Sequence, residues 1–303
     1  MRITNNTLTD GYLRNLSRNL NQMQKYQNQL SSGKEVSKPS DNPMAVSKIM
    51  NLDNSIKTNE QYNRNIDDAL GWVKTADGSL GEVTSSLLRA RDLIIYGANG
   101  TLSDTDRSAL ADEVEQLSGQ LTQVLNTNYD GRYIFGGQAT TTPPFSLGTD
   151  GVMAYNGKGG NITREIANGV NVGIPSQGDK ITTVSGTTGT GNADVGNLLK
   201  NIVTALRDGN TNELSGNLLG DIDKHIDNVI QVRSKMGTTY NRLEASSLRN
   251  EAENLNMTEL KSKNEDIDLA KKMMEFSVMS TVYEASLSVG AKVLQSSLLD
   301  YMR

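Results

Sequence analysis

Both ends of this chain carry long stripes of apolar residues at alternating spacings of three and four. Such a stripe stays on one side of a helix only when the helix packs against a partner in the manner of a coiled coil. The N-terminal stripe ends just before Gly33, and glycine commonly terminates a helix. The members of this stripe are Leu13, Leu16, Leu20, Met23, Gln27 and Leu30.

The C-terminal stripe is wider than one partner helix can cover. A helix of ~30 residues is ~45 Å long, and two such helices packed only on each other would leave much of this apolar face in water. A contiguous apolar surface of that size usually marks an association site, so we expect the two ends to pack on each other and on neighbouring subunits. The stripe consists of Leu269, Met273, Phe276, Ser280, Tyr283, Leu287, Gly290 and Leu294. A second stripe beside it consists of Met274, Val278, Val282, Ala285, Val289 and Val293.

The middle of the chain has a different composition. Residues 135–195 contain Pro143, Pro144 and Pro175, together with short β-like runs separated by glycine-rich turns. The pair Asn168-Gly169 lies between two such runs and predicts a hairpin whose type I′ turn has positive φ at both residues. A tract rich in glycine and threonine, residues 185–191, predicts a flexible linker.

On both sides of this insert the pattern is helical. Asn42 is a good N-cap for a helix with Pro43 at its first position. Ser103 and Asp106 have the spacing of a capping box at the start of another helix. The predicted fold is mainly α, with long antiparallel helices that form an N- and C-terminal coiled-coil pair and a helical bundle, and with a small inserted β domain.

These patterns predict three domains. A terminal coiled-coil assembly domain combines residues 1–45 with residues 258–303. A helical bundle domain combines residues 46–134 with residues 196–257, and residues 135–195 form the β-rich insert. An insertion of this kind brings the two chain ends back to the same place.

Residues that carry enzyme chemistry are scarce. The chain has no cysteine, which excludes disulfides, thiolate metal sites and cysteine nucleophiles. Its one histidine, His225, lies in a helical pattern, and no motif supplies the nucleophile that a general base would need. Residues 151–158 have the wrong spacing for a phosphate-binding loop. Asp221, Asp223 and Asp227 do not fit a calcium loop and are interpreted as a charged helix face.

We therefore expect no catalytic site, no cofactor and no bound metal. A soluble enzyme with an inserted β domain stays an alternative, and loss of an activity on substitution of His225 would favour it. The net charge of −5 argues against a general nucleic-acid binder, which needs a basic face. No apolar run suggests a cleaved signal or a membrane span, so we expect a protein that is cytosolic or exported by a route without such a signal.

Several segments, in the same order, resemble the bacterial flagellin and hook-associated superfamily. They are residues 30–34 (LSSGK), residues 99–107 (NGTLSDTDR) and residues 126–137 (NTNYDGRYIFGG). Three further segments resemble the members at the hook–filament junction more than flagellin itself. They are residues 1–5 (MRITN), residues 38–43 (KPSDNP) and residues 142–145 (TPPF).

The resemblance implies a structural subunit of the bacterial flagellum. Such proteins are held by an export chaperone and secreted through the flagellar type III channel. They then assemble as a ring of copies between hook-associated protein 1 and the flagellin filament. The termini would form the innermost coiled-coil layer, and the β insert would face outward. Because the apolar faces of both ends lack a full partner in a single molecule, we also expect ends that are mobile in the monomer and become helical on assembly.

The same resemblance places the assembly interface on the terminal stripes. The expected interface residues are Leu13, Leu16, Leu20, Met23, Leu30, Leu269, Met273, Phe276, Tyr283, Leu287 and Leu294. The main alternative function is a minor flagellin, a subunit of the filament itself. An adhesin or immune-facing role for the β insert is a weaker alternative.

Overall fold

The computed structural model describes residues 5–148, 150–188 and 191–301 of the chain. It forms two compact units. We call Met1–Thr58 together with Glu253–Arg303 the terminal unit, and Asn59–Ala252 the middle unit. The predicted division into three domains is a finer one, and it stays a prediction.

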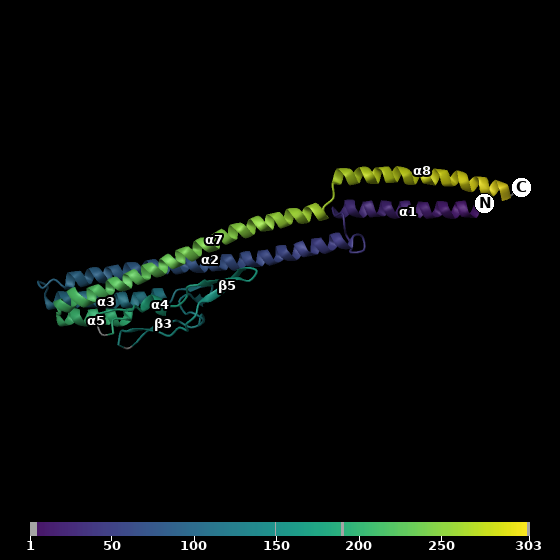
Figure 1. Ribbon diagram of the computed structural model, residues 1–303. Helices are drawn as coiled ribbons and strands as arrows, with labels where there is room; N and C mark the ends of the chain where they lie inside the picture. Colours follow the sequence, from purple (N-terminus) through teal and green to yellow (C-terminus); the bar gives the residue numbers. More distant parts are fainter. Residues whose placement is uncertain (1–4, 149, 189–190, 302–303) are drawn as a thin grey trace. The chain divides into compact units, whose positions relative to one another are not determined.

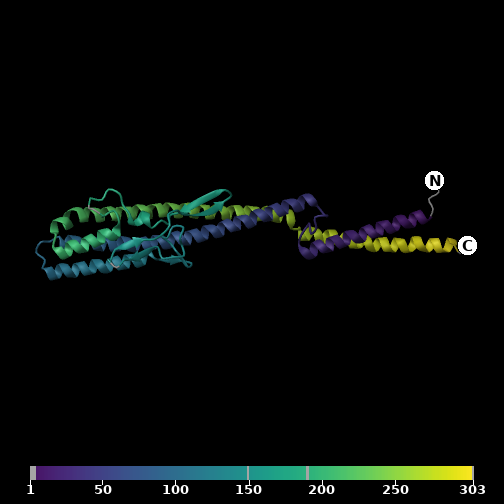
Figure 2. The same ribbon diagram turned by 90° about the horizontal axis from the view of Figure 1, so that it is seen from below.

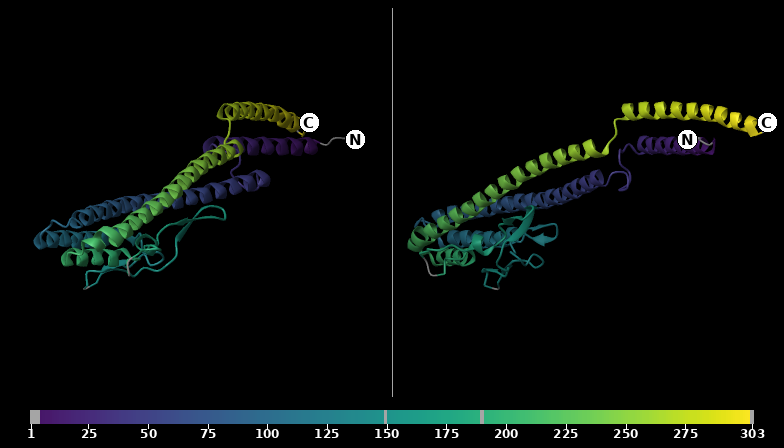
Figure 3. Two further views of the ribbon diagram at one scale, coloured as in Figure 1. Left: turned by 60° about the vertical axis from the view of Figure 1, so that its left-hand side comes forward. Right: turned by 45° about the vertical axis from the view of Figure 1, so that its right-hand side comes forward.

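The terminal unit is made of helices. α1 (Asn5–Ser32) and α8 (Leu269–Tyr301) lie side by side (Figures 1 and 3). The unit also contains the first turns of α2 (Pro43–Gly97) and the last turns of α7 (Leu219–Glu265). The two ends of the chain therefore meet as helices, as their stripes predict.

In the middle unit, the remaining parts of α2 and α7 run antiparallel (Figures 1 and 2). Two ion pairs mark this direction: Arg91 Nε lies 2.6 Å from Asp223 Oδ1, and Arg233 Nε lies 3.0 Å from Asp77 Oδ1. Both helices bury side chains at alternating spacings of three and four, the pattern of a coiled-coil seam. On α2 these are Ile66, Ala69, Val73, Ala76, Leu80, Val83, Leu87, Ala90 and Ile94. On α7 they are Ile222, His225, Val229, Val232 and Met236, and Leu243 follows seven residues later.

Shorter helices complete the core of the middle unit. They are α3 (Asp104–Leu125), α4 (Asp179–Thr182), α5 (Val195–Asp208), α6 (Thr211–Glu213) and the π-helical turn η1 (Leu214–Leu218). α3 and α5 pack on each other and supply buried leucine and isoleucine side chains. Among these are Leu121, Leu125, Leu198, Leu199 and Ile202.

Both predicted helix starts are confirmed. The Asn42 Oδ1 accepts a hydrogen bond from the Ala45 N–H at 3.1 Å, and α2 begins at Pro43. At the start of α3, Ser103 and Asp106 form a complete capping box, in which each side chain accepts from the other residue's backbone N–H.

The described strands form three separate antiparallel hairpins. The hairpins pair β1 (Asn128–Tyr129) with β2 (Arg132–Tyr133), β3 (Phe145–Leu147) with β4 (Met153–Tyr155), and β5 (Ile162–Ala167) with β6 (Val170–Ile174). The fold is thus mainly α with a small inserted β region, as predicted. The inserted strands do not form one continuous sheet among the described residues.

The turn types differ from the prediction. The β5–β6 hairpin is present, and φ at Gly169 is +72°. Asn168 does not have positive φ, so the predicted type I′ turn is wrong there. The turn with positive φ at both central residues is Asp130-Gly131, at 51° and 74°. Asp130 adopts this conformation because its short polar side chain tolerates the left-handed region.

Thr188, in the described part of the tract predicted as a flexible linker, and Asn192, just after that tract, are bonded to α7. The Thr188 N–H donates to Asp221 Oδ1 at 2.8 Å, and the Asn192 amide donates to Asp221 Oδ2 at 2.7 Å. Asp221 is completely buried, so the interpretation of this residue as part of a charged helix face is wrong. His225 is also completely buried, with Nε2 3.0 Å from the Asn192 carbonyl oxygen, and burial lowers its pKa. These contacts make His225 a core residue that helps to hold the tract in place.

Candidate assembly surface

α1 and α8 are joined by a seam that combines apolar and polar contacts. The Tyr12 hydroxyl donates to the Ser286 carbonyl oxygen at 3.0 Å, and the Asn19 amide donates to the Ser286 hydroxyl at 3.4 Å. Further along, Lys272 Nζ lies 5.4 Å from the centre of the Tyr26 ring, a cation–π contact. Because Tyr12 meets the later part of α8 and Tyr26 meets its start, the two helices are antiparallel.

The seam on α1 keeps Leu16, Met23 and Leu30 of the predicted stripe, but its other three positions are shifted by one residue. Tyr12, Asn19 and Tyr26 are half-buried against α8, whereas Leu13 and Leu20 are exposed. The half-buried positions again alternate by four and three, so the coiled-coil period is kept. They are Tyr12, Leu16, Asn19, Met23, Tyr26 and Leu30.

α8 shows the matching rotation. Met279 and Ser286 are half-buried, whereas Met273 and Leu287 are exposed. Gly290 is buried, and a methyl group there would overlap the Tyr12 phenol. The half-buried or buried seam positions on α8 are Lys272, Phe276, Met279, Tyr283, Ser286 and Gly290. Small residues on α8 therefore receive the large tyrosine of α1, and this fit sets the rotation of the pair.

The pair leaves a set of leucine, methionine and valine side chains on both helices exposed to water. We call this set the terminal ridge. Full burial of one such side chain contributes about 1.5–3 kcal/mol. Covering the terminal ridge with another subunit would therefore stabilise association strongly. Its members, with their exposed fractions, are Leu13 (51%), Leu20 (37%), Leu269 (56%), Met273 (59%), Met274 (66%), Val278 (58%), Val282 (42%), Leu287 (44%) and Val289 (56%).

The expected interface residues thus fall into two groups. The residues at the α1–α8 seam are Leu16, Met23, Leu30, Phe276 and Tyr283. The residues exposed on the terminal ridge are Leu13, Leu20, Leu269, Met273 and Leu287. The side chain of Leu294 lies outside the described residues. Their role in contacts between subunits stays a prediction.

Sequence reasoning missed the polar half of the seam. Tyr12, Asn19 and Tyr26 also recur every seven residues, next to Leu13, Leu20 and Gln27. That heptad repeat was a usable signal, but ranking positions by hydrophobicity favours the leucines. The tyrosines are amphipathic, and burying the ring while the hydroxyl finds a partner suits the edge of a narrow helix pair.

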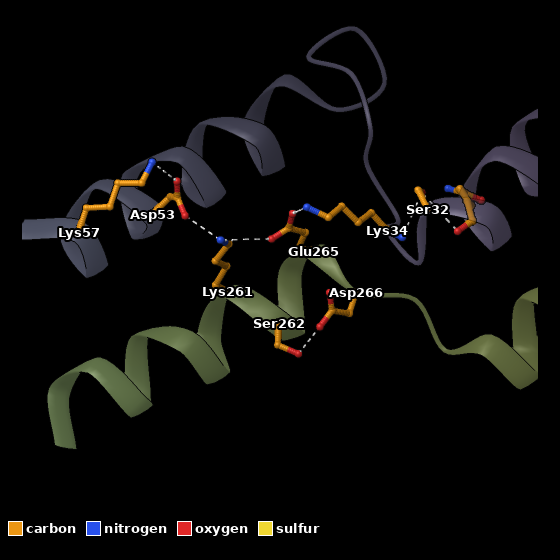
Figure 4. Close-up of polar contacts among 9 residues, drawn as sticks. Ser32, Lys34, Asp53, Lys57, Lys261, Ser262, Glu265 and Asp266 are labelled. Carbon is orange, nitrogen blue, oxygen red and sulfur yellow. Dashed lines mark hydrogen bonds and ion pairs between the residues drawn. The ribbon is translucent and has the colours of Figure 1, made fainter. Parts of the chain in front are cut away.

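A group of charged side chains lies at the end of the terminal unit where α1 ends and α8 begins (Figure 4). Figure 4 shows Lys261 between two carboxylates: its Nζ lies 2.7 Å from Asp53 Oδ1 and 3.8 Å from Glu265 Oε2. Lys57 Nζ lies 3.0 Å from Asp53 Oδ2, and Lys34 also pairs with Glu265. The hydrogen bonds from Lys261 and Lys57 lower the pKa of Asp53 to about 2.

Backbone contacts reinforce this end of the unit. The Glu35 N–H donates to the Glu265 carbonyl at 2.7 Å, and the Ile267 N–H donates to the Gly33 carbonyl at 3.1 Å. Gly33 has φ of +71°, a conformation that glycine adopts without strain. The segments that follow α1 and precede α8 are thus paired to each other, which sets where the two helices enter their seam.

The pair of terminal helices also forms a small hollow. A hollow of about 330 Å³ lies between α1 and α8 and is lined by Tyr12, Leu16, Val282 and Val289, among others. In the part of the chain that the structure describes, no group of three or more histidine, cysteine, aspartate or glutamate side chains is placed to hold a metal ion. No described helix has the length and hydropathy to cross a membrane.

Comparison with known proteins agrees with this architecture. The model of the bacterial flagellin N-terminal helical region matches residues 3–140, and that of the bacterial flagellin C-terminal helical region matches residues 219–302. Flagellar hook-associated protein 3 of Escherichia coli K12 is 29% identical over 303 residues, which cover 94% of this chain and 95% of that protein. A flagellin of Halalkalibacterium halodurans is 29% identical over 286 residues, which cover 93% of this chain and 92% of that protein.

The fold has solved counterparts. The crystal structure of the flagellar junction protein FlgL from Legionella pneumophila matches with a TM-score of 0.58 and 18% identity, covering 74% of this chain and all of that one. The two matched helical regions together span most of the chain, and the whole-length relatives are flagellar proteins. The chain belongs to the family of bacterial flagellins and flagellar hook-associated proteins, structural components of the bacterial flagellum.

Proposed function

We propose that this protein is the junction subunit between hook-associated protein 1 and the flagellin filament. The observation that carries the proposal is the terminal ridge, which α1 and α8 leave uncovered although they pack on each other. A junction subunit must present such a surface to three kinds of neighbour: copies of itself, the hook side and the filament side. The whole-length similarity to a hook-associated protein 3 supports this member of the family.

The rotated seam supports the same proposal. The pair uses Tyr12, Asn19 and Ser286 for internal contacts and keeps Leu13 and Leu20 outside. A pair optimised to be stable alone would bury the leucines first, because they gain most from leaving water. The arrangement instead favours a pair that gains its full stability in the assembled ring.

Export before assembly fits a chain of this kind. Such a subunit would leave through the flagellar type III channel, and an exposed apolar C-terminal helix is a suitable site for an export chaperone to cover beforehand. On this proposal residues 1–45 and 258–303 form the assembly domain, and residues 135–195 form an insert on the outside of the flagellum. The protein would act through packing and have no catalytic role.

Deleting the gene and examining cells by electron microscopy tests the proposal. Loss of a junction subunit should leave hooks without filaments, with unassembled flagellin in the medium, and expression of the intact chain should restore filaments. Normal filaments on the deletion strain would refute the junction role.

A minor flagellin is the second candidate, and a flagellin relative that is 29% identical over nearly the whole chain gives it weak support. Purified protein incubated alone distinguishes the two. A filament subunit should polymerise into long filaments, whereas a junction subunit should not extend beyond short assemblies.

A further inference from the structure

At the tip of the β5–β6 hairpin, the Glu165 carboxylate contacts the Asn168-Gly169 turn, a sequence in which asparagine is chemically reactive. Asn168 and Gly169 form the exposed turn, and Gly169 has φ of +72°. The Gly169 N–H donates to Glu165 Oε1 at 3.0 Å. Glycine has no side chain to shield its backbone nitrogen, so this nitrogen can approach the side-chain amide of the asparagine before it.

The backbone of β5 around Glu165 is anchored to the helices. The Glu165 carbonyl oxygen accepts a hydrogen bond from the Asn65 amide of α2 at 2.9 Å. On one side of it, Arg164 pairs with Asp68 of α2 at 2.7 Å, and on the other, the Ile166 carbonyl accepts from Asn250 of α7 at 3.1 Å. The strand that carries the carboxylate is therefore tied to two long helices, and the carboxylate contacts the turn through the Gly169 N–H.

The carboxylate has a second neighbour on α2. Burial, and then the nearby Glu165 carboxylate, raise the pKa of Tyr62. The Tyr62 hydroxyl thus stays protonated beside Glu165 and can orient it. A base must lie within about 2.6–3.2 Å of the group whose proton it takes, and Glu165 Oε1 meets this condition for the Gly169 N–H.

We propose that Asn168 is a site of self-modification, in which Glu165 acts as the general base for deamidation. Glu165 takes the proton from the Gly169 nitrogen while that nitrogen forms a bond to Cγ of Asn168. The bond from Cγ to Nδ2 breaks, and the leaving nitrogen receives the proton and departs as ammonia. Water then opens the cyclic imide, which leaves aspartate or isoaspartate at position 168.

The product changes the hairpin. Isoaspartate adds a methylene group to the backbone of the turn, and either product adds a negative charge close to Glu165. The two like charges repel each other, and this repulsion weakens the pairing of Ala167 with Val170 next to the turn. The tip of the hairpin therefore loosens as the protein ages.

Two other Asn-Gly pairs in the chain serve as internal references. At Asn99-Gly100 the Asn99 side-chain oxygen accepts from the Thr101 hydroxyl at 3.2 Å, and a carboxylate does not accept from the Gly100 N–H among the described contacts. At Asn156-Gly157 the Asn156 amide donates to the Ser146 hydroxyl at 2.8 Å, which ties up the group that must leave. Asn168 should therefore react fastest of the three.

The test is peptide mapping by mass spectrometry after incubation of the purified full-length protein near neutral pH. We expect Asn168 to deamidate at least about tenfold faster than Asn99, a modest share of what a positioned base provides. Glu165→Gln keeps the shape and a hydrogen-bond acceptor but removes the base, so it should lower the rate at Asn168 to that of Asn99 and leave Asn99 unchanged. A rate at Asn168 no higher than that at Asn99 would overturn the proposal.

A second measurement does not depend on the variant. In denaturant, Glu165 is no longer held on the turn, so the excess rate at Asn168 over Asn99 in the native sequence should disappear. Persistence of the full excess in the unfolded chain would assign it to local sequence and overturn the role of Glu165.

Discussion

Leu20→Asp separates the stability of the single chain from its ability to assemble. Leu20 is 37% exposed, so burying the remainder against a neighbouring subunit is worth about 1 kcal/mol, a fraction of the 1.5–3 kcal/mol for a whole side chain. An unpartnered carboxylate in that dry contact costs a further ~3–5 kcal/mol. The sum is about 4–6 kcal/mol per contact, or roughly a thousandfold to ten-thousandfold loss of affinity.

The isolated chain should tolerate the same change. The carboxylate that the substitution introduces at position 20 can reach water, so we expect unfolding of the middle unit to be unchanged and the α1–α8 pair to lose about 1 kcal/mol. The assay has two arms: thermal unfolding of the purified protein, and complementation of a deletion strain scored by electron microscopy for hooks with filaments. Asn21→Asp is the matched control, because it places the same charge on the next, polar, exposed position of α1.

The reasoning fails if cells carrying Leu20→Asp assemble filaments as well as wild type. It also fails if Asn21→Asp is equally defective, since the loss would then follow from charge on α1 and not from the terminal ridge.

Four further outcomes test the structure. Gly290→Ala should destabilise the α1–α8 pair by about 1–3 kcal/mol through overlap with Tyr12, and Tyr12→Leu should partly restore it, as measured by thermal unfolding. Lys261→Ala should raise the pKa of Asp53 from about 2 towards 3.8, which NMR of the carboxyl carbon can measure. In the native protein the folded-state pKa of Asp53 is lower than its unfolded-state pKa. The stability that Asp53 adds is therefore complete above pH 3.8 and is lost as the pH falls towards 2. Burial lowers the pKa of His225 below its ordinary 6.5, so stability should fall as the pH drops below 6.5, and His225→Gln should reduce this fall in a comparison of melting temperatures on both sides of that pH. Amide hydrogen exchange in dilute protein should be faster in α1 than in the buried stretch of α2, and strong protection of α1 would contradict mobile ends in the monomer.

Much of the fold was predictable because it depends on contacts between residues close together in the sequence. Asn42 and Ser103 cap helices as their residue types predict, since their side chains bond to groups only a few residues away. The helical ends and the inserted strands also follow from periodicity and from the placement of proline and glycine. These features need no knowledge of what lies across from them in space.

The rotation of the terminal seam was not predictable in this way. A stripe two residues wide tells which side of α1 is apolar, but not whether Tyr12 or Leu13 faces α8. That choice depends on the small residues Ser286 and Gly290, which are far away in sequence. The seam on α2 from Ile66 to Ile94 could have been found, because its three-four alternation is complete in the sequence.

The burial of the Asp221 carboxylate was also not predictable from the sequence pattern. Asp221 lies among aspartates that a helix would display to water, yet it holds the Thr188 and Asn192 groups of a distant tract. A carboxylate can be buried when hydrogen bonds satisfy its oxygens, and those partners come from a segment whose glycines and threonines resemble a free linker.

The described strands pair as three separate two-stranded ribbons, each with its own turn. A residue gained or lost at one tip therefore shifts the register of that ribbon alone, since a shared sheet does not transmit the slip to the other two. The helices beneath keep their heptads whatever happens at the tips. An architecture of this kind can vary its hairpin tips over evolutionary time while the helices that carry them stay constant.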